Sequence, residues 1–239
     1  MTDESESNRR FTHWDASSME ATSGAWVERR RLAAAMRVVI ERLVVSDAPE
    51  QELRRAADAL ESYADQLATH PKNVRYESWA ETSPSGDVAG FFDQSPLIGR
   101  ANPLSPPIVL EALPTENKVR GHVVFGSAYE GPPGCVHGGF VAAAFDEVLG
   151  FANSISGNPG MTAELTVRYR KPTPLHSELR FEAELLRVEG RKNFTAGRVL
   201  SGDLVTAEAE GLFIAVDRQK FKALYEARQR RERERSPKH

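Results

Sequence analysis

Residues 130–152 read Glu-Gly-Pro-Pro-Gly-Cys-Val-His-Gly-Gly-Phe-Val-Ala-Ala-Ala-Phe-Asp-Glu-Val-Leu-Gly-Phe-Ala, a proline-containing loop followed by an apolar segment. Pro132 and Pro133 exclude a helix at the start, whereas from Gly139 the residues are small or apolar for about four helical turns. The apolar members are Phe140, Val141, Ala142, Ala143, Ala144, Phe145, Val148, Leu149, Phe151 and Ala152. They fall on every face of the helix, a pattern typical of a helix buried in a core.

Two features of this segment indicate chemistry as well as packing. Asp146 and Glu147 interrupt the apolar run, and an ionised carboxylate moved out of water costs several kcal/mol unless it is paired. We therefore expect at least one of them to face a cleft. At the other end, His137-Gly138-Gly139 presents unpaired backbone N–H groups without bulky side chains, and such a helix N-terminus stabilises developing negative charge.

The spacing of these two features predicts a dimer. Gly139 and Asp146 are seven residues apart, which is about 10 Å along one helix at roughly 1.5 Å per residue. One helix cannot bring both to the same carbonyl group. If they cooperate, Asp146 must face the His137-Gly138-Gly139 end of a second copy packed antiparallel, which makes the active unit a two-fold dimer.

Strand patterns surround the helix. They cover residues 108–113, 118–125, 162–170, 178–188, 193–200 and 205–216. The last four are long and alternating, and short turns such as 189–192 and 201–203 predict an antiparallel meander. An apolar helix followed by four such strands can bury itself only on the face of their sheet. The sequence therefore predicts an α+β domain at 108–217, with an antiparallel sheet curled around a central helix.

A helical hairpin is expected before this domain, within residues 24–70. Apolar residues recur at helical spacing from Ala25 to about Val44 and again from Pro49 to Thr69. Asp47 is the predicted cap of the second helix, with Pro49 at an early helical position. Three interpretations of the hairpin stay open: packing onto the body or a dimer, a lid over an acyl channel, or a surface that docks a partner.

The remaining segments lack regular periodicity. Residues 1–23 are polar and expected to be disordered, with Trp14 as a candidate anchor, and residues 218–239 predict a charged helix and tail. Residues 71–107 are rich in proline and glycine and predict an irregular connecting belt. Its apolar residues either pin the belt to the body or line a substrate entrance; they are Phe91, Phe92, Leu97 and Ile98.

Composition excludes several classes of protein. A length of 239 residues fits one main domain with an extension, and a net charge of −3 with a pI near 6.1 gives no electrostatic reason to expect nucleic acid. The single cysteine, Cys135, rules out an internal disulfide. No apolar segment approaches the ~18 residues of a membrane span, and the acidic start is unlike a secretion signal. We expect a soluble, cytoplasmic protein.

Four motifs together carry a resemblance to a known family. They are Val-His-Gly-Gly at 136–139 with Asp146 nine residues after the His, Thr-Ala-Glu-Leu-Thr-Val-Arg-Tyr-Arg-Lys-Pro at 162–172, Gly-Arg-Ala-Asn-Pro-Leu-Ser-Pro-Pro at 99–107, and Tyr-Glu-Gly-Pro-Pro-Gly at 129–134. From about residue 88 to 216 the chain resembles hotdog-fold acyl-CoA thioesterases of the phenylacetyl-CoA-pathway (PaaI-like) type. The resemblance implies a hotdog fold, hydrolysis of acyl-CoA to carboxylic acid and CoA, and a homodimer or tetramer.

The resemblance also suggests roles for site residues. Asp146 corresponds to the acid that serves as general base or nucleophile, and Thr162 to a hydroxyl that helps to place the attacking water. Gly139 N–H is the expected donor to the thioester oxygen, and Gly138 lets the substrate approach. His137 either orients its own loop or contacts the substrate. The structural alternatives are a partnered helix carboxylate for Asp146 and the start of a strand for Thr162.

Further substrate contacts are expected from Glu147 and from two basic clusters. CoA phosphates require Arg or Lys near the groove mouth. The clusters are Arg168, Arg170 and Lys171, which close a strand, and Arg191 and Lys192, which occupy a turn; either is alternatively a solvated surface. Glu147 is alternatively a carboxylate satisfied by a structural partner. The six histidines are scattered, so no metal set is visible and no cofactor is expected.

Other observations bear on the mechanism and on rival functions. Position 131 is Gly, where some family members carry Asn six residues before the His, so a water-holding amide must come from elsewhere. A catalytic Cys135 is disfavoured, because this residue lies two positions from His137 in a proline loop without an orienting acid. A dehydratase is disfavoured by the lack of a separate catalytic His set. The remaining alternative is a non-catalytic acyl-CoA-binding regulatory protein that docks a partner through its N-terminal helices.

Overall fold

The computed structural model describes residues 24–70, 93–215 and 227. The interpretations of residues 1–23 with Trp14, of Phe91 and Phe92, and of the C-terminal segment 218–239 therefore fall outside the described residues, apart from Ala227.

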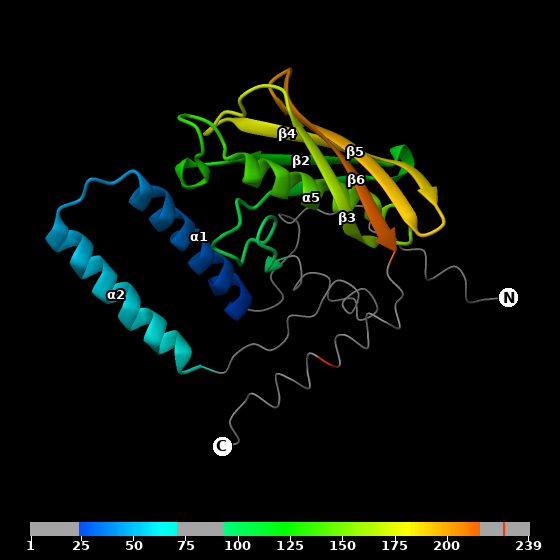
Figure 1. The fold of residues 1–239 in the computed structure, drawn as a ribbon. Helices are drawn as coiled ribbons and strands as arrows, with labels where there is room; N and C mark the ends of the chain where they lie inside the picture. Colours follow the sequence, from blue (N-terminus) through cyan, green and yellow to red (C-terminus); the bar gives the residue numbers. More distant parts are fainter. Residues whose placement is uncertain (1–23, 71–92, 216–226, 228–239) are drawn as a thin grey trace.

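The strands form one antiparallel sheet in the order β1-β2-β4-β5-β6-β3, so β1 and β3 are its edges. Their bounds are β1 Val109–Leu113, β2 Lys118–Val124, β3 Gly160–Tyr169, β4 Glu178–Glu189, β5 Lys192–Ser201 and β6 Leu204–Ala215. Helix α5, Gly138–Ser154, lies against one face of the sheet (Figure 1). The predicted α+β hotdog architecture is confirmed, and each strand bound agrees with the prediction to within two residues.

Side-chain size explains how α5 packs against the sheet. β2 alternates exposed and buried residues, so one face of the sheet is apolar. Phe145 of α5 is fully buried and meets Phe181 of β4 edge-on, with ring centroids 5.2 Å apart. Gly197 in β5 leaves room for the helix, because a Cβ there would lie 3.2 Å from Leu149. These contacts place α5 in the core.

One side of α5 is uncovered in the single chain. The buried residues gather on the side that faces the sheet: Val141, Ala144, Phe145, Val148, Leu149, Phe151, Ala152 and Asn153. Away from the sheet, Asp146 is exposed, and Phe140 is 38% exposed. The predicted core helix is confirmed on the side that faces the sheet, and Asp146 is open to solvent in one chain. Apart from Asp146, the outer side is formed mainly by small residues, including Ala143 and Gly150.

The two predicted N-terminal helices are confirmed as α1, Gly24–Val44, and α2, Glu50–Ala68. The predicted cap at Asp47 is wrong. Pro49 takes the N-cap position of α2, and its side chain forms no capping hydrogen bond with the free N–H groups there. The acidic residues of the first turn are favourable next to these N–H groups and supply the electrostatic part of a cap.

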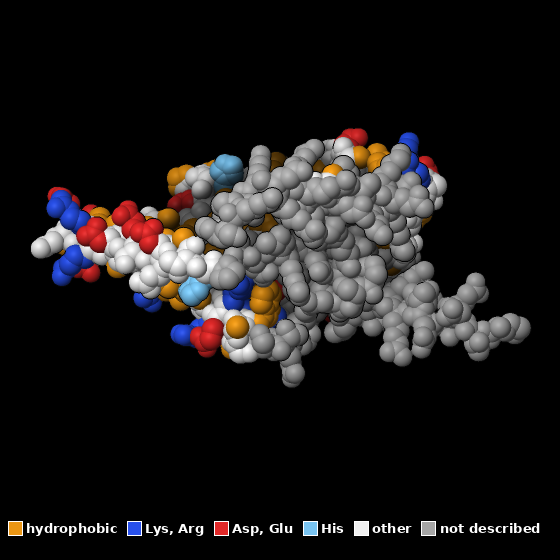
Figure 2. Space-filling view, turned by 90° about the horizontal axis from the view of Figure 1, so that it is seen from below, with side chains coloured by type: hydrophobic (Ala, Val, Ile, Leu, Met, Phe, Trp, Pro, Cys, Tyr) orange, Lys and Arg blue, Asp and Glu red, His pale blue; other side chains and the backbone are white. Residues whose placement is uncertain are grey.

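Helix α2 stands away from the domain. All of its residues are exposed, including an apolar stripe at helical spacing formed by Leu53, Leu60, Tyr63 and Leu67. In Figure 2 the hairpin projects from the body and carries charged side chains of both signs. None of the helices in the described part of the chain is both long and apolar enough to cross a membrane.

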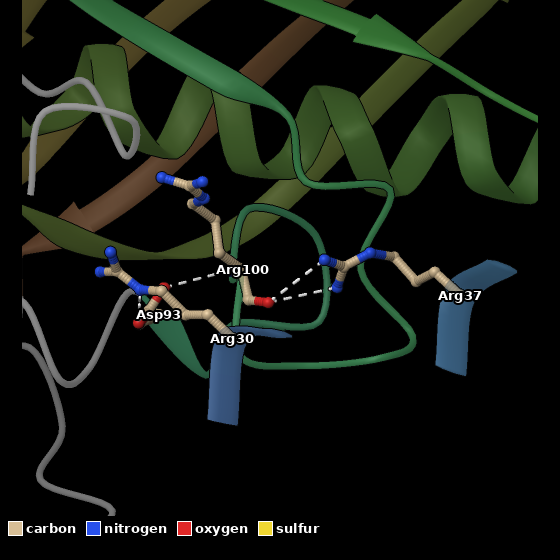
Figure 3. Close-up of polar contacts among 4 residues, drawn as sticks. All are labelled: Arg30, Arg37, Asp93 and Arg100. Carbon is tan, nitrogen blue, oxygen red and sulfur yellow. Dashed lines mark hydrogen bonds and ion pairs between the residues drawn. The ribbon is translucent and has the colours of Figure 1, made fainter. Parts of the chain in front are cut away.

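Helix α1, by contrast, is fixed to the belt by two arginines (Figure 3). Arg30 Nε lies 2.6 Å from Asp93 Oδ2, and both side chains are largely buried. Arg37 donates to the backbone oxygen of Arg100 at 3.3 Å, as Figure 3 shows. It also donates to the backbone oxygen of Asn102 at 2.8 Å. Leu97 and Ile98 pack into the domain core, which favours the interpretation that these belt residues pin it to the body.

Candidate active site

A tightly bonded loop leads into α5. Glu130 and Val136 form an isolated antiparallel bridge, and Gly131 N–H donates to Cys135 O at 2.9 Å. Val136 N–H donates to Thr173 O at 2.8 Å, which ties the loop to the segment after β3. The proline loop is thus fixed to the body, and the chain reaches His137 in a defined position.

His137 caps α5. Its Nδ1 accepts a hydrogen bond from Gly139 N–H at 3.0 Å, so the neutral ring carries its hydrogen on Nε2. The Tyr169 hydroxyl of β3 donates to Gly138 O at 2.7 Å and holds the same turn from the other side. Gly139 N–H, the expected thioester donor, is therefore engaged by the His137 ring. Within the described residues, no acceptor is bonded to Gly138 N–H.

Steric crowding explains why position 131 is glycine. A Cβ added there would lie 2.7 Å from the Cα of His137, closer than real Cβ contacts. An asparagine at this position could not be accommodated unless the backbone of the capping histidine moved. The close approach of residue 131 to His137 therefore explains why this chain has glycine where some family members have asparagine.

The structure brings Asp146 and Thr162 together. The Thr162 hydroxyl donates to Asp146 Oδ1 at 2.7 Å, linking the middle of α5 to the third residue of β3. Both residues are exposed, and β3 is an edge strand with a register shift between Thr162 and Glu164. A carboxylate oriented by a hydroxyl at an open edge is suited to activating water or attacking an electrophilic carbon.

Small residues surround Asp146 on the outer side of α5. Gly139, Ala143 and Gly150 share this side with Asp146 at helical spacing. A ligand or a second helix can therefore approach the backbone closely. Within one chain, Asp146 and the Gly138–Gly139 end still lie about two turns apart along the same helix.

Glu147 occupies a different environment from Asp146. Burial, with a smaller contribution from the charge of Asp146, raises the pKa of the Glu147 carboxyl to about 7. Near neutral pH this carboxyl holds its proton for part of the time and can then donate a hydrogen bond. Adjacent acids on one helix thus differ in environment, as expected where they have different roles.

Glu147→Gln should stabilise the protein at pH 8 and leave its stability at pH 5 nearly unchanged. The pKa of the Glu147 carboxyl is 4.5 in the unfolded chain and about 7 in the folded chain. Glu147 therefore contributes fully to the free energy of unfolding below pH 4.5, and this contribution is lost as the pH rises through about 7. The shift corresponds to about 3 kcal/mol at most, and partial exposure reduces the expected gain to about 1–2 kcal/mol. Urea unfolding at both pH values measures it, with the exposed Glu184→Gln as control. An equal change at pH 5 and pH 8 would contradict the assignment.

The two basic clusters lie at opposite ends of α5. The cluster at 168–171 surrounds Tyr169, which bonds to the start of the helix. The cluster at 191–192 precedes Asn193, whose Nδ2 donates to Asn153 near the helix end at 2.6 Å. The arginines have partners: Arg168 bonds to Glu210, Arg170 to Glu208, and Arg191 to Ala215 O. Lys171 and Lys192 are exposed.

Two further features concern metal-ligating and thiol side chains. In the described part of the chain, no three His, Cys, Asp or Glu side chains gather as a metal site requires. Cys135 Sγ lies 3.5 Å from Pro133 O, a backbone group of its own loop. Sequence reasoning missed the contact of Tyr169 with Gly138, because 31 residues separate them and the strand pattern carries no signal for it.

The fold and this exposed carboxylate define a hotdog protein with a candidate hydrolytic site. Residues 133–208 match the family model of the thioesterase superfamily. A crystal structure of a thioesterase superfamily protein is 38% identical, with a TM-score of 0.72, and the match covers 85% of this chain and 95% of that one. This chain belongs to the thioesterase superfamily.

Curated relatives match a smaller part of this chain. The acyl-coenzyme A thioesterases THEM4 of Bos taurus and Mus musculus are each 40% identical over 97 residues, which are 40% of this chain and 40% and 42% of those proteins. The chain thus spans about two fifths of the curated relatives that it matches. A phenylacetic acid degradation-related protein of Ralstonia eutropha is 21% identical over 45% of this chain and 84% of that one, with a TM-score of 0.42, and does not decide the subfamily.

Proposed function

We propose that the protein hydrolyses acyl-CoA thioesters to a free carboxylic acid and CoA. The observation that carries the proposal is the hydrogen bond from the Thr162 hydroxyl to Asp146 Oδ1 on the open side of α5. Membership of the thioesterase superfamily supports the reaction type, and similarity to acyl-coenzyme A thioesterases supports the substrate class. The nine-residue spacing from His137 to Asp146 supports a PaaI-like type within the superfamily.

Asp146 promotes attack on the thioester carbonyl carbon in one of two ways. As a general base it takes a proton while water adds to the carbon; as a nucleophile it adds to the carbon itself, and water then hydrolyses the resulting anhydride. In both routes the C–S bond breaks and the sulfur takes up a proton, so that acyl-CoA and water give the carboxylic acid and the CoA thiol. Thr162 holds Oδ1, which leaves Oδ2 for water or substrate.

The complete site requires two copies of the chain. Asp146 and the Gly138–Gly139 end are too far apart along one helix to meet at a single carbonyl group. The small residues beside Asp146 let a second α5 pack closely and antiparallel, and the edge strand β3 can extend its sheet into a second copy. In this arrangement Asp146 of one protomer faces the Gly138–Gly139 end of its partner.

The Gly138–Gly139 end supplies the donors for the thioester oxygen. Gly138 N–H has no protein acceptor within the described chain, and Gly139 N–H would be shared between the substrate oxygen and His137 Nδ1. Donors fixed before the reaction stabilise the oxyanion of the tetrahedral intermediate without reorganisation. His137 is then an orienting group that keeps the first turn of α5 in place.

The basic residues at 168–171 and 191–192 are the proposed contacts for the phosphates of CoA. The exposed Lys171 and Lys192 have charges that a phosphate can reach without displacing another partner shown in the structure. The arginines bond to glutamates or to a backbone oxygen, so each would have to share its guanidinium with the ligand.

The direct test is hydrolysis of a panel of acyl-CoA thioesters. Acetyl-, octanoyl-, palmitoyl- and phenylacetyl-CoA would each be incubated with the purified protein, and the released CoA thiol followed with a thiol reagent. We expect saturable release from at least one of them. Absence of release from every substrate would overturn the proposal.

The exposed apolar stripe of α2 favours a second candidate, a non-catalytic acyl-CoA-binding protein that docks a partner through the hairpin. This candidate predicts acyl-CoA binding in calorimetry without turnover, and loss of partner binding when residues 24–70 are deleted. Turnover of any bound acyl-CoA would exclude it.

A further inference from the structure

Glu41, near the end of α1, contacts the segment that leads into the active-site loop. Its Oε1 accepts a hydrogen bond from Ser127 N–H at 2.9 Å, and its Oε2 accepts one from Ala128 N–H at 3.3 Å. These two N–H groups begin the short 3-10 helix η2, Ser127–Tyr129. Glu41 lies 86 residues before Ser127 and outside the stretch that matches the thioesterase family model. The contact joins the N-terminal extension to the catalytic domain.

This contact replaces a cap that η2 cannot supply for itself. Its N-cap residue is Gly126, which has no side chain to bond the free N–H groups of the first turn. A Cβ at position 126 would lie 2.7 Å from the carboxyl carbon of Glu41, so the glycine makes room for the distant carboxylate. Burial acts in the opposite direction, but the hydrogen bonds from Ser127 and Ala128 hold the pKa of Glu41 below its ordinary value. The cap is therefore ionised at neutral pH.

The capped turn η2 in turn positions His137. Tyr129 O accepts the His137 N–H at 2.8 Å. The Tyr129 ring packs edge-on against Phe140 in the first turn of α5, with centroids 4.9 Å apart. His137 Nδ1 then accepts from Gly139 N–H. An unbroken series of contacts thus runs from Glu41 through η2 and His137 to the N–H groups proposed to bind the thioester oxygen.

We infer that Glu41 is a positioning residue for the thioesterase site: by capping η2 it holds Tyr129 and His137 so that the Gly138–Gly139 end of α5 faces the substrate carbonyl. The inference rests on the proposed function, because the oxyanion donors have a role only if a thioester is cleaved. Oxyanion donors act through their exact placement, and a displacement of about 1 Å can lower a rate by about 100-fold. The helical extension is then a part of the catalytic unit.

Kinetics of substitutions at Glu41 test this role. Glu41→Ala is expected to lower kcat by about 10- to 100-fold and to change KM by less than about twofold, because the donors act mainly in the transition state. Glu41→Gln keeps an oxygen that can accept from Ser127 N–H, and it should restore most of the lost kcat. Glu28→Gln is the matched control, since Glu28 lies on the same helix and pairs with Arg31 at an exposed position. We expect wild-type kinetics from this control.

Hydrogen–deuterium exchange separates failure of this inference from failure of the proposed function. Glu41→Ala should speed exchange of residues 126–141 while leaving exchange of β4 and β5 unchanged, whether or not any thioester is cleaved. If the wild type cleaves no thioester and exchange still rises, the proposed function fails and Glu41 remains the residue that fixes the loop. Wild-type kcat in Glu41→Ala, unchanged exchange at 126–141, or a loss of activity that only follows a loss of folded protein would overturn the inference.

Discussion

Asp146→Asn should lower kcat for acyl-CoA hydrolysis by about 100- to 10,000-fold, the range expected when a general base or nucleophile is removed. The amide matches the carboxylate in size and can still accept a hydrogen bond from the Thr162 hydroxyl, which now donates to Oδ1 at 2.7 Å. It can neither take a proton from water nor attack the thioester carbon. Acyl-CoA binding should persist, because the substitution removes charge from the site without adding bulk. Steady-state release of CoA thiol gives kcat, and calorimetry on the variant gives the affinity.

The matched control for this substitution is Asp203→Asn, in the exposed turn between β5 and β6. It removes the same charge far along the sequence from the proposed site and should leave kcat unchanged. If Asp146→Asn and Asp203→Asn both hydrolyse acyl-CoA at the wild-type rate, Asp146 is not the reacting group.

Phe145→Ala should destabilise the folded chain by about 3–5 kcal/mol, the usual cost of removing a buried phenyl ring. Phe145 has no exposed surface and meets Phe181 edge-on at 5.2 Å, so the substitution leaves a cavity between α5 and the sheet. The neighbouring strands pair antiparallel on both sides of Phe181 and cannot readily collapse into that space. Unfolding in urea, followed by circular dichroism, measures the loss.

Leu204→Ala is a suitable comparison for the buried phenylalanine. Leu204 lies at the start of β6 and is 52% exposed, so its truncation should change stability by no more than about 0.5 kcal/mol. A loss below about 1.5 kcal/mol for Phe145→Ala would show that α5 is not packed against the sheet as described.

The sheet and helices could be predicted because their signals are local. Alternation along the chain, short turns and a single apolar helix define the strands from Val109 to Ala215 without any long-range information. The prediction of the cap of α2 is wrong for an equally local reason. Asp47 precedes Pro49, and the backbone places the proline rather than the aspartate at the N-cap position.

The site could be predicted only in part. An acid within an apolar helix marks Asp146 as a candidate, and the family resemblance implies Thr162; the structure joins the two by a hydrogen bond, while their catalytic roles stay predictions. The bond from Tyr169 to Gly138 and the cap that Glu41 provides to η2 bridge 31 and 86 residues, and no periodicity links positions so far apart. The exposure of the outer side of α5 could not be predicted, because its residues other than Asp146 are small or apolar and a sequence pattern does not separate such a side from a buried one.

A subunit-complementation measurement tests the central claim that each site takes Asp146 from one protomer and the Gly138–Gly139 end from the other. Asp146→Asn and Gly138→Val chains, each expected to be inactive, would be co-expressed with different affinity tags and purified as mixed dimers. Such a dimer has one site with both defects and one with none, so its activity should be about half that of the wild type. Mixed dimers no more active than either parent, or a fully active monomer, would contradict the shared site.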